Sequence, residues 1–147
     1  MMFLLDTNVV SELRKVRAGK ADAGVSAWAA NVDASALFMS AITVMELEMG
    51  VLQVERRDTA QGALLRTWLD RHVLVEFADR VLPIDAAVAR RCARLHVPDR
   101  RSERDALIAA TALVHGMTVV TRNVADFAST EARIFNPWGE AGGKKIE

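Results

Sequence analysis

Four carboxylic acids stand at points of the sequence where an acid is not the expected residue. Asp6 ends the apolar run MMFLL, Glu46 lies in the mostly apolar stretch ITVMELEMGV, Asp105 shares a helical face with apolar residues, and Asp126 follows the β-branched run MTVVT. Carboxylates that cluster repel one another, and one of them takes up a proton unless a cation compensates the charge. Because oxygen-only ligands select hard cations, the set fits Mg²⁺ or Mn²⁺ better than zinc. A divalent ion held in this way can activate water for attack on a phosphodiester.

Each acid also has an ordinary structural explanation. Asp6 fits the N-cap of a following helix, and Asp105 would complete a capping box with Ser102 in the stretch SERD. Glu46 could face solvent, and Asp126 could be a turn residue, since aspartate favours turns. These explanations are weaker together than singly, because three of the four acids fall where strand ends and helix starts would cluster.

The elements that would position these acids alternate along the chain. Strands are expected at 2–5, 37–40, 117–121 and 133–136, with a short strand or turn at 82–85 and a polar turn at 122–127. Helices are expected at 9–15, about 22–33, 42–56 with Ser40 as its cap, 62–77, 85–96 and 102–115 with Gly116 as its end; the later half of 62–77 could instead be extended.

This alternation indicates an α/β fold with three layers, α/β/α, in which a small parallel sheet is flanked by helices. Ligands of such sheets bind beyond the carboxyl ends of the strands. Asp6, at the end of the first expected strand, would therefore lie where an active site is expected.

Composition narrows the class of protein. With 147 residues, half of them apolar, the chain is expected to fold around a core rather than to remain disordered. The single cysteine, Cys92, excludes an internal disulfide and is expected to be a small buried side chain. MMFLL is too short for a secretory signal, and no apolar run reaches the ~18 residues that span a bilayer. We therefore expect a cytoplasmic protein with no membrane contact.

Polar residues next to the acids are candidates for supporting roles. Four of them could hold waters or a phosphate oxygen, namely Thr7, Asn8, Thr121 and Asn123. The three histidines are isolated, so histidine-based metal chemistry is not expected at His72, His96 or His115.

The net charge of zero argues against an RNA or DNA binder that relies on global positive charge. Arginines nevertheless concentrate between residues 90 and 104, where a solvated helix face is the alternative to a phosphate-binding patch. The candidates for contacts to RNA phosphates are Arg100, Arg101 and Arg104, which directly precede Asp105, together with Arg122.

Four stretches of the chain together resemble a known protein family. They are FLLDTNVVSEL, SAITVMELEMGV, ERDALIAATALVHGMTVVTRNVADF and FNPW, which run in order from Phe3 to Trp138 and cover nearly the whole chain. On these motifs the chain is similar to PIN-domain proteins, and among them to the VapC toxins of bacterial toxin–antitoxin pairs, specifically the FitB-like branch.

The resemblance implies a single PIN domain over residues 1–138 and a Mg²⁺- or Mn²⁺-dependent endoribonuclease activity. Residues 139–147 are expected to form a flexible tail. The family's acidic residues match three acids by position, namely Asp6, Glu46 and Asp105. The match selects Glu46 over Glu48, which periodicity does not separate. The fourth acid is placed at Asp126, with Asn123 in support, because some relatives carry an acid where this chain has Asn123.

The resemblance also implies partners. Such toxins are held inactive by a small antitoxin that wraps around them, and operator DNA is bound only through the antitoxin. A homodimer is expected, and a toxin–antitoxin hetero-oligomer is possible in such systems. The apolar helices near Trp28 and around 64–75 could supply these surfaces, although core packing is the commoner role of such residues.

Two other classes of function stay open. A non-catalytic PIN-like protein would bind RNA or a partner without cutting, although all four acids are retained. An aspartyl-phosphate enzyme, either phosphatase or receiver-like, would use Asp6 as nucleophile, but such phosphatases carry a second aspartate where this chain has Asn8. A nucleotide-binding domain is disfavoured, because no glycine-rich phosphate loop follows any expected strand.

Overall fold

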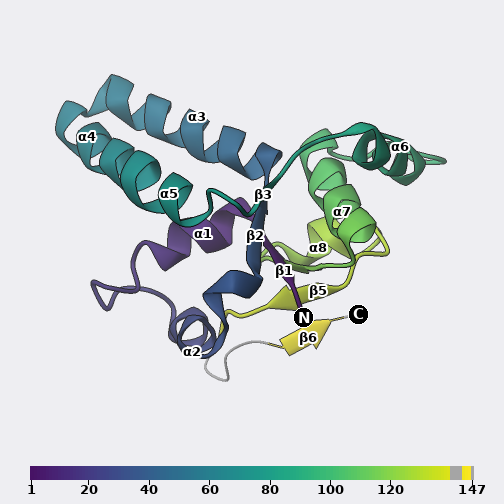
Figure 1. The fold of residues 1–147 in the computed structure, drawn as a ribbon, viewed down its shortest axis with the longest axis horizontal. Coiled ribbons are helices and arrows are strands. Elements are labelled where there is room, and N and C mark those ends of the chain that lie inside the picture. Colours follow the sequence, from purple (N-terminus) through teal and green to yellow (C-terminus); the bar gives the residue numbers. More distant parts are fainter. Residues whose placement is uncertain (140–143, 147) are drawn as a thin grey trace.

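Short strands form one sheet in the computed structural model, which describes residues 1–139 and 144–146 (Figure 1). Within this part of the chain the strand order is β3-β2-β1-β4-β5-β6, with β1 to β5 parallel and β6 antiparallel to β5. The strands are β1 (Phe3–Leu5), β2 (Leu37–Ser40), β3 (Val81–Leu82), β4 (Thr118–Val120), β5 (Ile134–Asn136) and β6 (Lys144–Ile146).

Helices cover both faces of this sheet, which confirms the expected three-layer α/β/α architecture. They are α1 (Thr7–Leu13), α2 (Ala23–Asn31), the short 3₁₀ helix η1 (Ala34–Ala36), α3 (Ala41–Arg57), α4 (Thr59–Trp68), the π-helical η2 (Leu69–Val73), α5 (Leu74–Glu76), α6 (Ala86–Leu95), α7 (Glu103–His115) and α8 (Val124–Phe127). None of the helices within residues 1–139 combines the length and apolar character needed to cross a lipid bilayer.

The alternation of side chains along each strand divides the apolar residues between two cores. Leu4 and Val119 point to one face, where they pack in a cluster with residues of α6, α7 and α8. Leu5 and Val120 point to the other face, where they pack with residues of α1, α3 and η2. Cys92 of α6 is buried in the first cluster, as expected. The two cores hold the central strands β1 and β4 in place and so fix their carboxyl ends.

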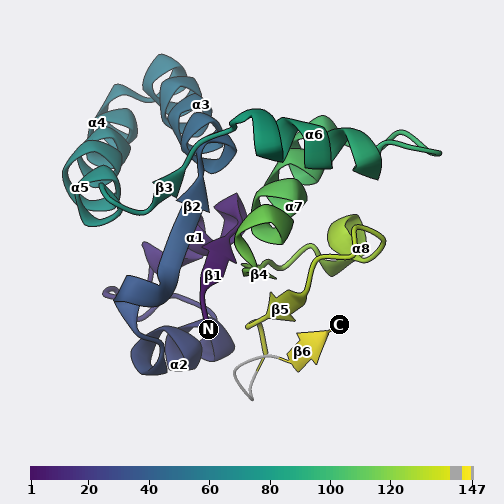
Figure 2. The ribbon, with the colours of Figure 1, turned by 45° about the vertical axis from the view of Figure 1, so that its right-hand side comes forward.

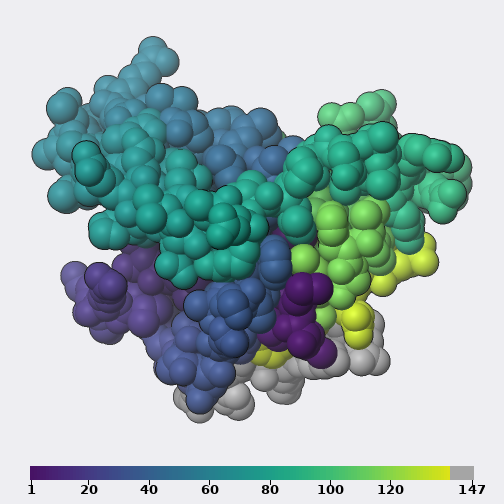
Figure 3. Space-filling view, viewed as in Figure 1, coloured from purple at the N-terminus to yellow at the C-terminus, as the bar shows by residue number. Residues whose placement is uncertain are grey.

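The α3, α4 and α5 helices form an arm that stands apart from the α6–α7 pair (Figure 2). In the space-filling view the two groups lie on opposite sides of the molecule (Figure 3). Ser40 caps α3 as predicted, since its hydroxyl accepts a 3.0 Å hydrogen bond from the N–H of Ile42. Arg66 of α4 donates to Glu48 and Glu55 of α3 and so ties the two long helices of the arm together.

Several elements differ from the alternatives that the sequence leaves open. The segment after Trp68 continues as helix through η2 and α5, so the extended alternative is wrong. Its apolar residues Leu69, Val73 and Phe77 face the second core, which favours a helical path. The stretch expected to be a polar turn instead contains the one-turn helix α8, because Phe127 is drawn into the first core. The expected cap of α7 at Gly116 is confirmed, with a left-handed φ of 67°.

The segment after β5 folds back across the start of α2. The N–H of Gly139 donates to Asp22 over 3.1 Å, and a Cβ at Gly24 would lie 1.9 Å from the carbonyl oxygen of Gly139. Lys144–Ile146, in the expected flexible tail, pair with the free edge of β5 as β6. Residues 140–143 and 147 of that tail lie outside the described residues.

Candidate active site

Asp6 lies at the carboxyl end of β1, where the chain passes from strand to helix. Its N–H still belongs to the sheet and donates to the carbonyl oxygen of Val120 over 2.9 Å. Its Oδ1 accepts a 2.8 Å hydrogen bond from the N–H of Thr7, so the predicted N-cap of α1 is confirmed. The cap uses one carboxylate oxygen and directs the other toward the end of β4.

The second oxygen of Asp6 is held by two polar side chains. Thr121, which follows β4, donates its hydroxyl to Oδ2 over 2.8 Å, and the amide of Asn8 donates to the same oxygen over 3.2 Å. The Thr121 hydroxyl also accepts from the N–H of Asn123, and Asn8 Oδ1 accepts from the N–H of Arg122. Because Thr121 is fully buried and Asp6 is only 6% exposed, this network fixes the carboxylate.

Glu46 reaches the same edge of the sheet from α3. Its Oε1 accepts a 2.6 Å hydrogen bond from the hydroxyl of Thr7, and its Oε2 lies 3.5 Å from Nη1 of Arg104. Glu48 instead contacts Arg66 through both carboxylate oxygens, at 2.9 and 2.6 Å. The two glutamates that periodicity leaves equivalent thus face different surroundings, and it is Glu46 that lies beside Asp6's neighbour Thr7.

Asp105 and Asp126 complete the acidic cluster from the other face of the sheet. Asp105 lies in the first turn of α7, and the capping box expected with Ser102 is not formed, since Ser102 makes no capping hydrogen bond. Burial, followed by repulsion from Asp126, Asp6 and Glu46, raises the pKa of Asp105. Asp126 lies in α8 and is exposed. Four acids that are far apart in sequence therefore act on one another electrostatically.

Asp6 is subject to the same effect. Burial is the main cause that raises the pKa of Asp6, and the charge of Glu46 adds to it. Hydrogen bonds from Thr121, Thr7 and Asn8 act in the opposite direction but do not outweigh burial. The cluster therefore carries negative charge that the surrounding protein groups do not fully compensate.

The donor set fits a hard divalent cation. All four acids and their polar neighbours offer oxygen ligands, which Mg²⁺ and Mn²⁺ prefer. Within residues 1–139 and 144–146, no three Asp, Glu, His or Cys side chains stand close enough to enclose an ion. Mg²⁺ keeps several waters and binds through one or two carboxylates and the substrate's phosphate rather than in a closed protein cage.

The histidines lie away from the acids. His72 lines a groove beside α1, and His96 accepts a 3.2 Å hydrogen bond from the N–H of Arg101 through Nδ1. His115 lies in the last turn of α7, at the opposite end of that helix from Asp105. Their positions agree with the expectation that histidine does not provide the metal chemistry.

The candidate RNA-binding arginines have different surroundings. Arg100 is 81% exposed and lies 3.6 Å from Glu103, outside the acidic cluster. Arg101 donates to the carbonyl oxygen of Leu95 and to the hydroxyl of Ser129, both over 2.6 Å, so its guanidinium ties the loop before α7 to the segment after α8. Arg100 is thus free to meet a ligand, whereas Arg101 is engaged within the fold.

Arg122 lies on the β5 side of the cluster. Its guanidinium carbon is 5.6 Å from the centroid of the Trp138 ring, while its N–H holds Asn8. Trp138 follows the end of β5 and therefore lies at the same edge of the sheet as Asp6. Sequence reasoning gives Trp138 only as part of the FNPW motif, and the parallel pairing of β4 with β5 brings it beside the site.

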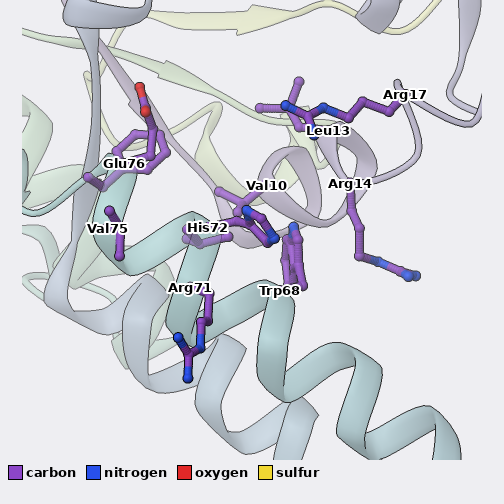
Figure 4. Close-up of a pocket in the computed structure, with 11 residues that line it drawn as sticks. Val10, Leu13, Arg14, Arg17, Trp68, Arg71, His72, Val75 and Glu76 are labelled. Carbon is purple, nitrogen blue, oxygen red and sulfur yellow. The ribbon is translucent and has the colours of Figure 1, made fainter.

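A groove of about 580 Å³ lies between α1 and the arm, away from the four acids (Figure 4). Its floor is apolar and aromatic, and its rim carries more basic than acidic side chains. The lining residues are Val10, Leu13, Arg14, Arg17, Trp68, Arg71, His72, Val73, Val75, Glu76 and Phe77. This groove agrees with the expectation of an apolar surface around 64–75. The sequence does not predict that α1 lines it as well, through Val10 and Leu13.

Comparison with known proteins assigns the chain to a family. The PIN domain family model matches residues 3–132. The chain belongs to the PIN-domain family. This PIN-domain protein is 38% identical over 148 residues to the VapC ribonuclease Y4jK of Sinorhizobium fredii, an alignment that covers 95% of this chain and 100% of the relative. It is 36% identical over 143 residues to the toxin FitB of Neisseria gonorrhoeae, covering 93% and 99% of the two chains.

Solved structures agree with this assignment. A chain in the crystal structure of FitAcB from Neisseria gonorrhoeae matches the PIN-domain protein with a TM-score of 0.83 and 34% identity, covering 93% of this chain and 99% of that one. A chain of FitAB bound to an IR36 DNA fragment matches with a TM-score of 0.84, also at 34% identity, covering 94% and 96%. The resemblance read from the four sequence motifs is therefore confirmed at the level of the family and the fold.

Proposed function

We propose that this PIN-domain protein is a Mg²⁺- or Mn²⁺-dependent endoribonuclease and acts in the cytoplasm as the toxin of a type II toxin–antitoxin pair. The observation that carries the proposal is the meeting of Asp6, Glu46, Asp105 and Asp126 at one edge of the sheet, where burial and mutual repulsion raise the pKa of two of them. The relatives named as a VapC ribonuclease and as the toxin FitB support the same activity.

Each acid has a proposed role in this reaction. Asp6 and Asp105 would hold the ion, with Glu46 and Asp126 completing its surroundings directly or through water. When bound, the ion would stabilise the negative charge that develops on the scissile phosphate and would lower the pKa of an attacking water. Asp6 is oriented for this role by hydrogen bonds to both of its oxygens. Thr121, which is fully buried and donates to Asp6, would keep the carboxylate in this orientation when an ion is bound.

The same contacts weigh against an aspartyl-phosphate enzyme. The residue at Asn8 is a hydrogen-bond donor to Asp6, not a second acid. A non-catalytic protein that only binds RNA remains the alternative, and cleavage assays separate the two.

The test is cleavage of structured RNA by the purified protein, with and without Mn²⁺ or Mg²⁺. We expect cleavage that requires the ion and is lost in Asp6→Asn and in Asp105→Asn, which keep the size of each side chain and remove its charge. Circular dichroism and the melting temperature check that both variants fold. Full cleavage by both variants would refute the site, and an absence of cleavage by the wild type on any RNA would favour the binding-only alternative.

We further propose that the groove beside α1 receives the antitoxin. Its floor of Val10, Leu13 and Trp68 offers apolar contact, and Val75 at its edge is 66% exposed. The rim carries three arginines and a histidine against a single glutamate, which favours an amphipathic partner segment with acidic residues. The solved structure of FitAB, a chain of which is similar to this one at 34% identity, supports a partner of this kind.

A matched pair of variants tests the groove. The first step is to find an adjacent reading frame that encodes a short protein, whose co-expression should suppress toxicity of the wild type. We expect Val75→Glu to weaken co-purification of that protein by at least about tenfold, because it places an acid in an apolar contact that favours acidic partners. Leu64→Glu, at an equally exposed residue outside the groove, is the control. Equal effects of the two substitutions would contradict the assignment. The oligomeric state of the free protein, measured by light scattering, tests the expected homodimer.

A further inference from the structure

Arg104 is the arginine whose guanidinium contacts the acidic cluster. Its Nη1 lies 3.5 Å from Oε2 of Glu46, and no other ion pair within the described part of the chain involves any of the four acids. Two other arginines of the α6–α7 region are engaged elsewhere, since Arg91 pairs with Glu131 and Arg101 donates to Ser129. Among the residues that the structure describes, Arg104 is therefore the cation that pairs with an acid of the cluster.

This ion pair is not built like a structural one. Arg104 is 49% exposed, its distance of 3.5 Å to Glu46 is long, and its guanidinium makes no hydrogen bond to another element among residues 1–139. Half-exposed ion pairs of this kind contribute little to stability. Arg66, by comparison, makes close hydrogen bonds to two glutamates of α3 and holds helices together. The Arg104 side chain can therefore leave Glu46 at little cost to the fold.

The contacts of Glu46 explain why Arg104 would leave it when a metal ion binds. One of its oxygens is taken by the Thr7 hydroxyl at 2.6 Å, so Oε2 is the one that remains for an ion, and that is the oxygen that faces Arg104. A divalent cation that draws on Oε2 competes with the guanidinium for it. The released side chain starts one residue before Asp105, in the first turn of α7, at the mouth of the cluster.

Once released from Glu46, the Arg104 guanidinium could bind the phosphate of the RNA that is being cleaved. As water attacks phosphorus, negative charge builds up on the two non-bridging oxygens of the phosphate. A guanidinium matches those two oxygens with parallel N–H donors, which a single ammonium cannot do. Groups aimed at charge that develops in the transition state give some of the largest single contributions to catalysis.

We propose that Arg104 is a catalytic residue, held on Glu46 in the absence of RNA and transferred to the scissile phosphate when metal and RNA bind. The inference rests on the proposed nuclease function and separates Arg104 from the neighbouring arginines. Arg100, which is 81% exposed and pairs only with Glu103, would at most attract the RNA backbone.

The test compares Arg104→Gln and Arg104→Lys with Arg100→Gln and with the control Arg57→Gln. Mn²⁺ binding to the RNA-free protein is measured by isothermal titration calorimetry, and cleavage is measured in single turnover over a range of RNA concentrations. We expect Arg104→Gln to bind Mn²⁺ about fivefold more tightly, because the competing cation is gone. Its cleavage rate at saturating RNA should fall about 100-fold, with less than about fivefold change in half-saturating RNA. Arg104→Lys should recover part of that rate.

Arg100→Gln should raise the RNA concentration that gives half-maximal cleavage. Arg57→Gln, at the exposed last residue of α3, is the control that should change neither the Mn²⁺ affinity nor the saturated rate. A saturated rate of Arg104→Gln equal to that of the wild type would overturn the proposal, as would an effect confined to RNA binding like that of Arg100→Gln. If the wild type cuts no RNA, the nuclease function fails by itself. In that case an unchanged Mn²⁺ affinity of Arg104→Gln would still overturn the exchange.

Discussion

Replacing Thr121 by valine should destabilise this protein far more than the loss of one hydroxyl usually does. The Thr121 hydroxyl donates to the buried carboxylate of Asp6 over 2.8 Å and accepts from the N–H of Asn123 over 2.9 Å. A hydrogen bond to a charged group contributes about 1.5–3 kcal/mol, and leaving the second partner unpaired adds to the cost. We therefore expect a loss of about 2–4 kcal/mol in the free energy of unfolding.

Two other buried threonines are matched controls for the same substitution. Thr130 is fully buried and donates to the neutral carbonyl oxygen of Phe127 over 2.6 Å, so Thr130→Val should cost only about 1 kcal/mol. Thr118 is 1% exposed, and its hydroxyl has no partner within the described part of the chain. Thr118→Val replaces an unpaired buried hydroxyl in a strand by a methyl group and should leave stability unchanged or raise it.

The assay is thermal unfolding of the metal-free protein in a chelator, followed by circular dichroism at neutral pH. For a chain of this length, a loss of 2–4 kcal/mol lowers the melting temperature by about 6–12 °C. In an Asp6→Asn background the cost of Thr121→Val should shrink toward that of Thr130→Val, because the acceptor is then neutral. Equal shifts for the three valine variants would refute the claim that Thr121 stabilises a buried charge.

Three further outcomes follow from other parts of the molecule. Because the folded protein raises the pKa of Asp105 above its ordinary 3.8, Asp105→Asn should melt higher than the wild type at pH 7 without metal. That advantage should shrink as pH falls through the raised pKa and vanish below about 3.8, and Mn²⁺ should raise only the wild-type melting temperature. Gly24→Ala should lower the melting temperature, since its Cβ would lie 1.9 Å from the carbonyl oxygen of Gly139, whereas Gly50→Ala, with open space around it, should gain up to about 1 kcal/mol. Arg66→Met should lower the melting temperature slightly, and less in high salt, and should speed hydrogen exchange in α4, because it removes the hydrogen bonds between the two long helices of the arm.

The sequence predicts the four strands β1, β2, β4 and β5 and the acid that follows the first of them, because a buried strand needs an apolar run. Asp6 breaks such a run, and β1 ends one residue before it. Which acid of α3 belongs to the site cannot be predicted in the same way. Nothing in the periodicity of α3 separates Glu46 from Glu48, since the choice depends on Thr7 on one side and Arg66 on the other. Those partners are brought in by tertiary structure.

Other features depend on contacts that no local pattern encodes. The one-turn helix α8 forms where the sequence indicates a polar turn, because Phe127 anchors it in a core made by distant elements. The pairing of β6 with β5 depends on a free sheet edge rather than on the propensities of KKI, which carry little strand signal. The contact between Arg104 and Glu46 depends on the packing of α7 against α3.

The position of β1 in the middle of the sheet sets the order in which this protein is completed during synthesis. β1 precedes β4 in the chain, yet the two strands are neighbours in the sheet, and the hydroxyl that holds Asp6 belongs to a residue 115 positions later. A ribosome that stops before residue 118 has made neither β4 nor Asp126. A fragment released before residue 118 thus carries only part of the acidic cluster, and the cluster assembles only after Asp126 has been made.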